Sequence, residues 1–232
     1  MTLKVGINGF GRIGRMILRS IIEQNRKDLE VVAINNRSDA ETSSFLLIND
    51  TVHGKLKSKI SHSEKTINID GKKINMIQEN EISKIDWKKY KVNIVLECTG
   101  KFNTKEKSSQ HINSGANKVI VSAPCKGAKS IIYGVNEKNL KSSDQVISAA
   151  SCTTNCLAPV AQVLNEDFGI ERGFMTTIHS YTTDQRLLDN RRGKCLRTIF
   201  WLPGPEIRES FSRHVWRYSA RHLSRQYLDK PR

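Results

Sequence analysis

Two residues in this sequence, Cys152 and His179, are of the types that together perform nucleophilic catalysis. Cys152 follows Ser151 and begins a segment whose apolar spacing predicts a helix that stops at Gly169. The helix dipole stabilises a thiolate in the first turn, and Ser151 is a suitable N-cap. His179 ends a strand-like run, 174–179, and a histidine near a cysteine can activate it as a nucleophile. Spacing alone leaves coincidence as the alternative explanation of this pair.

A glycine-rich turn near the amino terminus has the spacing of a dinucleotide-binding motif. Gly9, Gly11 and Gly14 follow the apolar run Leu3–Asn8 and lead into a helical pattern that extends to Ile22. Such glycines permit a tight turn, a close approach of the backbone to a pyrophosphate, and close packing of helix on strand. Free N–H groups at the start of the helix would bind the anion. We therefore predict dinucleotide binding, with a merely structural turn as the alternative.

The residue that should bind the ribose of NAD has no carboxylate in this sequence. In NAD-binding domains the second strand ends in Asp or Glu, which binds the ribose 2′-hydroxyl. Here the predicted strand Glu30–Asn35 is followed by Asn36 and Arg37. Asn36 would not repel a 2′-phosphate, and Arg37 could pair with one. We predict NAD or NADP as the cofactor and expect NADP to be accepted; the alternative is that Asn36 still binds NAD while Arg37 is solvated.

Predicted strands and helices alternate along most of the chain, which is the pattern of a doubly wound α/β fold. We expect residues 1–150 to form a Rossmann-type domain around a parallel sheet. Residues 151–190 would be the incomplete start of an α+β catalytic domain. Beyond the two strands already named, apolar runs predict strands at Ile67–Ile69, Lys73–Ile77, Asn93–Glu97, Lys118–Ser122 and Val146–Ala149.

The composition is typical of a cytoplasmic protein with reduced cysteines. No apolar stretch approaches the ~18 residues of a membrane span, and the first strand begins without a preceding signal peptide. The five cysteines are odd in number, and their spacing matches neither a disulfide scaffold nor a zinc motif. We therefore expect a cytoplasmic chain with no membrane association and no metal site.

Residues 191–232 differ in composition from the rest of the chain. They contain 11 of the 38 Lys and Arg residues but 3 of the 23 acidic residues, so they hold +8 of the net charge of +15. One explanation is a basic amphipathic tail for nucleic acid, an anionic membrane or a protein partner. The other, which we favour, is a shift of reading frame near residue 190. On that interpretation the tail does not bind nucleic acid.

Several motifs resemble those of phosphorylating glyceraldehyde-3-phosphate dehydrogenases, in that family's order and spacing. The most specific is SCTTNC at residues 151–156, and the resemblance covers residues 1–190. The motifs are Val5–Gly14 (VGINGFGRIG), Asn49–Gly54 (NDTVHG), Glu97–Gly100 (ECTG), Ser122–Pro124 (SAP), Ser151–Pro159 (SCTTNCLAP) and Thr177–Gln185 (TIHSYTTDQ).

The resemblance implies that Cys152 attacks the aldehyde carbon of glyceraldehyde 3-phosphate and that His179 takes the proton. Hydride then passes to the nicotinamide, and inorganic phosphate cleaves the thioester to give 1,3-bisphosphoglycerate. The resemblance also implies binding roles for residues that match the family's motifs. Those for the cofactor are Gly9, Gly11, Arg12, Ile13, Gly14, Asn36, Arg37, Thr99 and Ser122. Those for the substrate and the attacking phosphate are Ser151, Thr153, Thr154, Thr182 and Asp184.

The sequence departs from the family's pattern in three places. The run 78–81 lacks the usual arginine near residue 80, and Asn36 replaces the usual acidic residue. After Asn190 the family's phosphate-binding Thr-Gly segment and most of its catalytic domain do not follow. The resemblance implies a homotetramer that binds a small-molecule substrate and inorganic phosphate, but we expect this chain to be inactive.

Two other functions stay open at this stage. Erythrose-4-phosphate dehydrogenase shares the thiol chemistry, although the run 181–183 looks more like the triose-phosphate enzyme. A non-catalytic nucleotide-binding fragment with a basic tail is the alternative from a different class.

Overall fold

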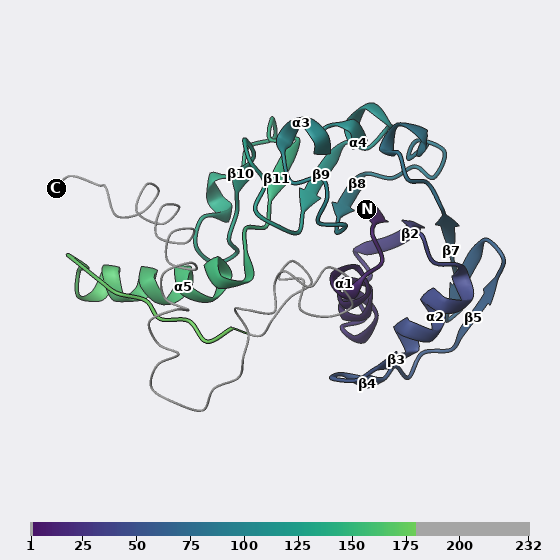
Figure 1. Ribbon diagram of the computed structural model, residues 1–232, viewed down its shortest axis with the longest axis horizontal. Coiled ribbons are helices and arrows are strands. Elements are labelled where there is room, and N and C mark those ends of the chain that lie inside the picture. Colours follow the sequence, from purple (N-terminus) through teal and green to yellow (C-terminus); the bar gives the residue numbers. More distant parts are fainter. Residues whose placement is uncertain (1, 180–232) are drawn as a thin grey trace, which may run out of the picture. The chain divides into compact units, whose positions relative to one another are not determined.

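Strands and short helices alternate in the computed structural model, which describes residues 2–179 (Figure 1). The described residues belong to two units, which divide between Pro159 and Val160. The strands are β1 (Leu3–Asn8), β2 (Leu29–Asn35), β3 (Asn49–Asp50), β4 (Gly54–Lys55), β5 (Ile60–Ser63), β6 (Thr66–Ile69), β7 (Lys72–Ile77), β8 (Ile94–Glu97), β9 (Lys118–Val121), β10 (Lys129–Ser130) and β11 (Val146–Ser148). The helices are α1 (Arg12–Glu23), α2 (Ala40–Ile48), α3 (Lys105–Ser108), α4 (Gln110–Asn113) and α5 (Cys152–Asp167), with short 3-10 turns η1 (Ile82–Lys84) and η2 (Glu137–Asn139).

Nine of the strands form one largely parallel sheet, in the order β10-β11-β9-β8-β1-β2-β7-β6-β5. The strands from β10 to β7 run parallel to one another, and β6 and β5 continue the sheet as antiparallel strands. The chain leaves β1 toward β2 on one side and later returns to β8 on the other. The strand order therefore reverses between β1 and β8, which is the point where open α/β sheets bind ligands.

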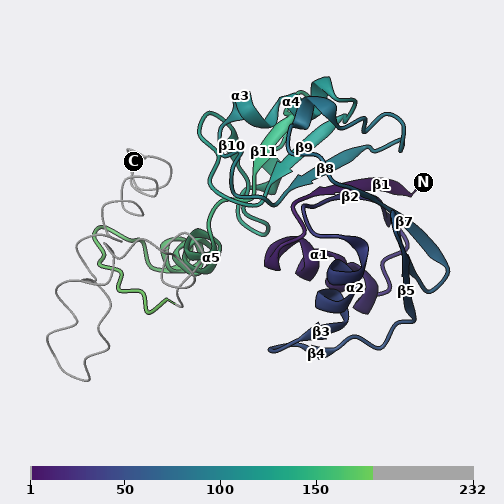
Figure 2. The same cartoon turned by 45° about the vertical axis from the view of Figure 1, so that its right-hand side comes forward.

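Helices lie on both faces of this sheet, as the doubly wound prediction requires. Helices α1 and α2 lie on one side, and α3 and α4 lie on the other (Figures 1 and 2). Strand β2 contributes to two separate cores, because Val31 and Ile34 belong to one buried cluster whereas Val32 and Ala33 belong to another. The predicted α/β fold class is confirmed by this arrangement.

The predicted strands near the site form within a residue or two of their expected bounds. The prediction of a strand at 174–179 is wrong. This segment has no regular secondary structure. A strand needs a neighbouring strand to pair its backbone groups, and the two described sheets do not include this segment. Phe174 is 94% exposed and Ile178 is 102% exposed, so its apolar side chains are not packed.

None of the helices among residues 2–179 combines the length and the apolar character that crossing a membrane would require.

The third glycine of the turn gives a stability prediction. A Cβ at Gly14 would lie 2.2 Å from the carbonyl oxygen of Gly9, whereas one at Gly11 would meet nothing within 4 Å. Alanine normally stabilises a helix interior by about 1 kcal/mol relative to glycine. We expect Gly14→Ala instead to lower the free energy of unfolding by about 1–3 kcal/mol, because the backbone at Gly9 must move to make room for the methyl group.

Gly11→Ala is the matched control, and we expect it to change the stability by less than about 1 kcal/mol. Urea unfolding followed by circular dichroism would measure both. An equal loss for the two variants would contradict the packing argument.

Candidate functional site

A pocket lies at the carboxyl ends of β1, β2 and β8, where the strand order reverses. Its volume is about 200 Å³. Five of the predicted cofactor residues line it together, and the remaining residues of the lining had not been predicted. The lining residues are Asn8, Gly9, Gly11, Asn35, Asn36, Arg37, Glu79, Asn80, Ile82, Cys98, Thr99, Lys101 and Phe102.

The glycine turn has the geometry that a pyrophosphate needs. Gly9 has φ +94°, a conformation that favours glycine, and a Cβ there would lie 2.8 Å from the backbone nitrogen of Thr99. Gly11 is the N-cap residue of α1, and no side chain among residues 2–179 caps that end of the helix. The first turn of α1 also holds no acidic residue. Its backbone N–H groups are thus suited to an anion, because neither a cap nor a negative charge competes for them.

Arg12, at the start of α1, is held by an acidic residue that sequence reasoning missed. Its Nη1 lies 2.6 Å from Oδ2 of Asp50, whose side chain is 3% exposed while that of Arg12 is 48% exposed. The pKa of Asp50 is lowered to about 2, first by the backbone N–H of His53, then by that of Val52 and by Arg12. The charged carboxylate therefore anchors the guanidinium beside the glycine turn, and Asp50 in the NDTVHG motif is a positioning residue for it.

The two residues after β2 lie where the ribose-binding residue was expected. The Asn36 amide oxygen accepts a long hydrogen bond of 3.4 Å from the backbone N–H of Phe10, and its nitrogen lies 3.3 Å from the Ser43 hydroxyl. Arg37 is exposed and lines the same pocket. Lys101 adds a second cationic side chain to the lining. The lining of the pocket therefore includes the Asn36 amide and two cationic side chains, Arg37 and Lys101.

Thr99 and Ser122 follow neighbouring strands, β8 and β9, but they differ in their relation to the pocket. Thr99 lines it, and Ser122 does not. The Ser122 hydroxyl instead contacts the Cys98 thiol, and its backbone N–H donates to the Glu97 carbonyl. Burial raises the pKa of the Cys98 thiol to about 12, so this pocket-lining cysteine is protonated at neutral pH.

The predicted nucleophile helix begins where the sequence placed it. The Ser151 hydroxyl accepts a hydrogen bond of 3.0 Å from the backbone N–H of Thr154, which confirms Ser151 as the N-cap of α5. Cys152 is the first residue of α5 and is exposed. Ala150, just before the cap, has φ +59°, an uncommon conformation for a residue other than glycine. Gly169 follows the end of the helix with φ +72°, as the predicted stop requires.

Other predicted residues lie apart from the pocket or outside the described residues. Arg12, Ile13 and Gly14 belong to the first turn of α1, and Ile13 is 50% exposed. Thr153 lies in the first turn of α5 with Thr154. Thr182 and Asp184 lie outside the described residues. The pairing of Cys152 with His179 stays a prediction.

Sequence reasoning missed the polar residues that end the central strands. Asn8 and Asn35 close apolar strands and are 2% and 6% exposed. A polar residue at the carboxyl end of a buried parallel strand is a usable signal, because its burial requires hydrogen-bond partners. The contribution of Glu79 comes mainly from its backbone, which leaves no mark in the sequence.

Comparison with known proteins places both parts of the chain in one family. A family model for the NAD-binding domain of glyceraldehyde 3-phosphate dehydrogenase matches residues 3–105. The model for the C-terminal domain of the same family matches residues 151–198, which is eight residues beyond the end of the resemblance noted in the sequence.

Curated relatives with the name glyceraldehyde-3-phosphate dehydrogenase match most of the chain. The protein from Cereibacter sphaeroides is 50% identical over 190 residues, which is 82% of this chain and 56% of the relative. The protein from Thermotoga maritima is 48% identical over 187 residues, 80% of this chain and 56% of the relative. The chain thus spans just over half the length of these relatives.

Burial predicts an order of thiol reactivity among the described cysteines. Cys152 and Cys156 are exposed, whereas Cys98 and Cys125 have raised pKa values, chiefly because burial disfavours the thiolate. With a pKa of about 12, the Cys98 thiol stays protonated at neutral pH and is a poor nucleophile. We expect iodoacetamide to label Cys152 and Cys156 well before Cys98 and Cys125.

Peptide mapping after brief alkylation measures this order. Labelling in urea is the control, because unfolding should remove the differences. Early modification of Cys98 or Cys125 in the folded chain would contradict the described geometry.

Proposed function

This chain belongs to the glyceraldehyde-3-phosphate dehydrogenase family, whose amino-terminal domain binds NAD, and we propose on that premise that its own pocket holds NAD between β1, β2 and β8. The family role that we assign is the phosphorylating oxidation of glyceraldehyde 3-phosphate. We assign residues 1–150 to the nucleotide-binding domain and residues 151–190 to the start of the catalytic domain. The observation that supports this best is the glycine turn, whose uncapped helix end opens at the point where the strand order reverses.

The residues of the turn divide the work of binding. The backbone N–H groups at the start of α1 would bind the pyrophosphate, with Arg12 nearby on its Asp50 anchor. Thr99 would contact the adenine side, and Ser122 the nicotinamide side. The cofactor, when bound, supplies the hydride acceptor.

The thiol chemistry belongs to the first turn of α5. Cys152 would attack the aldehyde carbon to form a thiohemiacetal, with its proton passing to His179. Loss of hydride would leave a thioester on Cys152, which phosphate cleaves to an acyl phosphate. Ser151, Thr153 and Thr154 would contact substrate and phosphate. Thr182 and Asp184 would bind the substrate's own phosphate, and a homotetramer would be the assembly, as the family implies.

We further propose that the 232-residue chain by itself binds NAD but does not turn over substrate. Most of the rate of such a reaction comes from holding the reacting groups in place. The segment that leads to His179 forms no strand, and Phe174 and Ile178 are fully exposed. We expect NAD binding by calorimetry and no reduced nicotinamide above background when glyceraldehyde 3-phosphate and phosphate are added.

Two controls make the activity test decisive. A complete relative of the family provides the positive control, and Cys152→Ser in this chain defines the background. Turnover at the typical enzyme rate of about 1–10³ s⁻¹, lost in Cys152→Ser, would contradict the proposed inactivity. Failure of the chain to bind either NAD or NADP would contradict the proposed cofactor site.

The amide and cations beside the pocket support acceptance of NADP. At the end of β2, where NAD-binding domains carry a carboxylate, a 2′-phosphate would meet Asn36 and Arg37. We expect Asn36→Asp to weaken NADP relative to NAD by about 10–100-fold, because it sets a second negative charge against the phosphate. The Asp side chain can keep the contacts to Phe10 and Ser43, so the fold should not change.

Arg37→Gln is the companion variant, and we expect it to weaken NADP while it leaves NAD unchanged. Dissociation constants for both nucleotides, measured on all three chains by calorimetry, provide the comparison. A wild-type chain that binds NAD alone, with no response to either change, would show that NADP is not accepted.

A further inference from the structure

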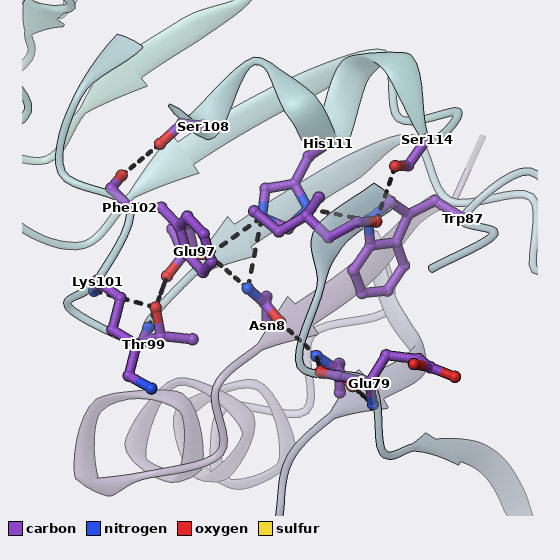
Figure 3. Close-up of polar contacts among 12 residues, drawn as sticks. Asn8, Glu79, Trp87, Glu97, Thr99, Lys101, Phe102, Ser108, His111 and Ser114 are labelled. Atoms are coloured by element: carbon purple, nitrogen blue, oxygen red, sulfur yellow. Dashed lines mark hydrogen bonds and ion pairs between the residues drawn. The ribbon is translucent and has the colours of Figure 1, made fainter. Parts of the chain in front are cut away.

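A fully buried hydrogen-bonded pair, a histidine and a glutamate, lies behind the nucleotide pocket. Glu97 ends β8 and His111 lies on α4, and the side chains of both are 0% exposed (Figure 3). The His111 Nε2 atom lies 3.0 Å from Oε2 of Glu97. Neither residue lines the pocket, yet Glu97 contacts two residues that do, Asn8 and Thr99.

On the pocket side, contacts with the backbone of Glu79 determine which groups donate and which accept in the hydrogen bonds from Asn35 through Asn8 to Glu97. Asn35 donates to the Glu79 carbonyl at 2.9 Å and accepts from the Glu79 N–H at 2.8 Å, so its amide can have only one orientation. Asn35 also donates to Oδ1 of Asn8 at 2.7 Å, which leaves the Asn8 nitrogen facing Glu97. That nitrogen donates to Oε2 of Glu97 at 2.5 Å.

On the opposite side, a tryptophan fixes the tautomer of His111. The indole N–H of Trp87 can only donate, and it donates to Nδ1 of His111 at 3.0 Å. Because Nδ1 accepts this bond, the proton of the neutral ring lies on Nε2, and Nε2 donates to Glu97. The Asn8 nitrogen, 3.5 Å from Nε2, is then a neighbouring donor to the same carboxylate.

The other oxygen of Glu97 holds the wall of the pocket. Oε1 accepts from the backbone N–H of Thr99 at 2.7 Å and from the Thr99 hydroxyl. The Thr99 hydroxyl in turn accepts from the backbone N–H of Lys101 at 3.1 Å. Thr99 is the residue that packs against Gly9 of the glycine turn, so a shift of Thr99 would alter the space for the nucleotide.

We propose that His111 is a positioning residue of the nucleotide pocket, which acts through Glu97 on Thr99 and Asn8. The proposal rests on the proposed function, in that the pocket binds NAD. A buried carboxylate is tolerated only when donors satisfy it, and within the described part of the chain His111 supplies one of the four donors to Glu97. Without that donor the carboxylate must turn or admit water, and its hold on Thr99 weakens.

Two substitutions of His111 separate positioning from packing. In His111→Gln, the side-chain nitrogen can take the place of Nε2 and keep the bond to Glu97, but the acceptor for Trp87 is lost. In His111→Asn, the amide oxygen can take the place of Nδ1 and keep the bond from Trp87, but the donor to Glu97 is lost. Both variants lose the volume of the imidazole ring, so they carry a similar packing defect.

We expect the NAD dissociation constant of His111→Gln to stay within about threefold of wild type, and that of His111→Asn to rise about tenfold or more. Trp87→Phe should bind NAD like wild type with a lowered melting temperature. Calorimetry gives the affinities, and circular dichroism gives the melting temperatures. Affinities of the three variants that simply follow their melting temperatures would overturn the proposal in favour of a structural role.

Hydrogen exchange of the Thr99 amide tests the same inference without nucleotide. We expect faster exchange in His111→Asn than in His111→Gln, because only the former loses the donor to Glu97. Equal exchange in the two variants would overturn the proposal. If the wild-type chain does not bind NAD, the cofactor assignment fails, whereas the Thr99 exchange still decides whether His111 positions this wall.

Discussion

Glu97 keeps its carboxylate inside the protein at the end of a central strand, and a carboxylate can stay there only where donors surround it. The donors come from three parts of the chain: Asn8 at the end of β1, Thr99 just after β8, and His111 on α4. Satisfying this one group therefore fixes how two central strands and a helix meet. The nucleotide pocket lies directly in front of it and takes its shape from the same contacts.

The glycine turn depends on this arrangement from the other side. Gly9 has no room for a side chain because Thr99 lies against it, and Thr99 is held by Glu97. Gly14 packs on the carbonyl of Gly9, which brings the start of α1 close to the end of β1. The anion-binding start of α1 and the hydrogen bonds that satisfy the Glu97 carboxylate at the end of β8 are thus parts of one local structure.

The parts that sequence analysis could predict are those encoded by local pattern. The apolar run of β1, the glycines and the helix α1 follow one another within about 20 residues. The spacing of apolar residues and the positions of the glycines are therefore sufficient to predict them. The N-cap role of Ser151 is equally local, since it depends on the residue three positions later.

Predictions failed where the deciding contact is distant in the sequence. His111 is 14 residues from Glu97 and 24 from Trp87, and only the packing of α4 on the sheet brings them together. The segment 174–179 has residues suited to a strand, but it joins neither of the described sheets. Helices α3 and α4 have four residues each, too few to show a helical period.

The central position of β1 has a consequence for the way the chain is made. Its first neighbour, β2, follows within one βαβ unit, but Val5 pairs with Ile94, which is 89 residues further along. At translation rates of about 5–20 residues per second, the first strand waits roughly 5–20 seconds at the ribosome before its second neighbour emerges. During that interval one edge of β1 is unpaired and its apolar side chains lack their final cover. Among the strands of this sheet, β1 therefore waits longest for its second neighbour, and it depends longest on protection from aggregation.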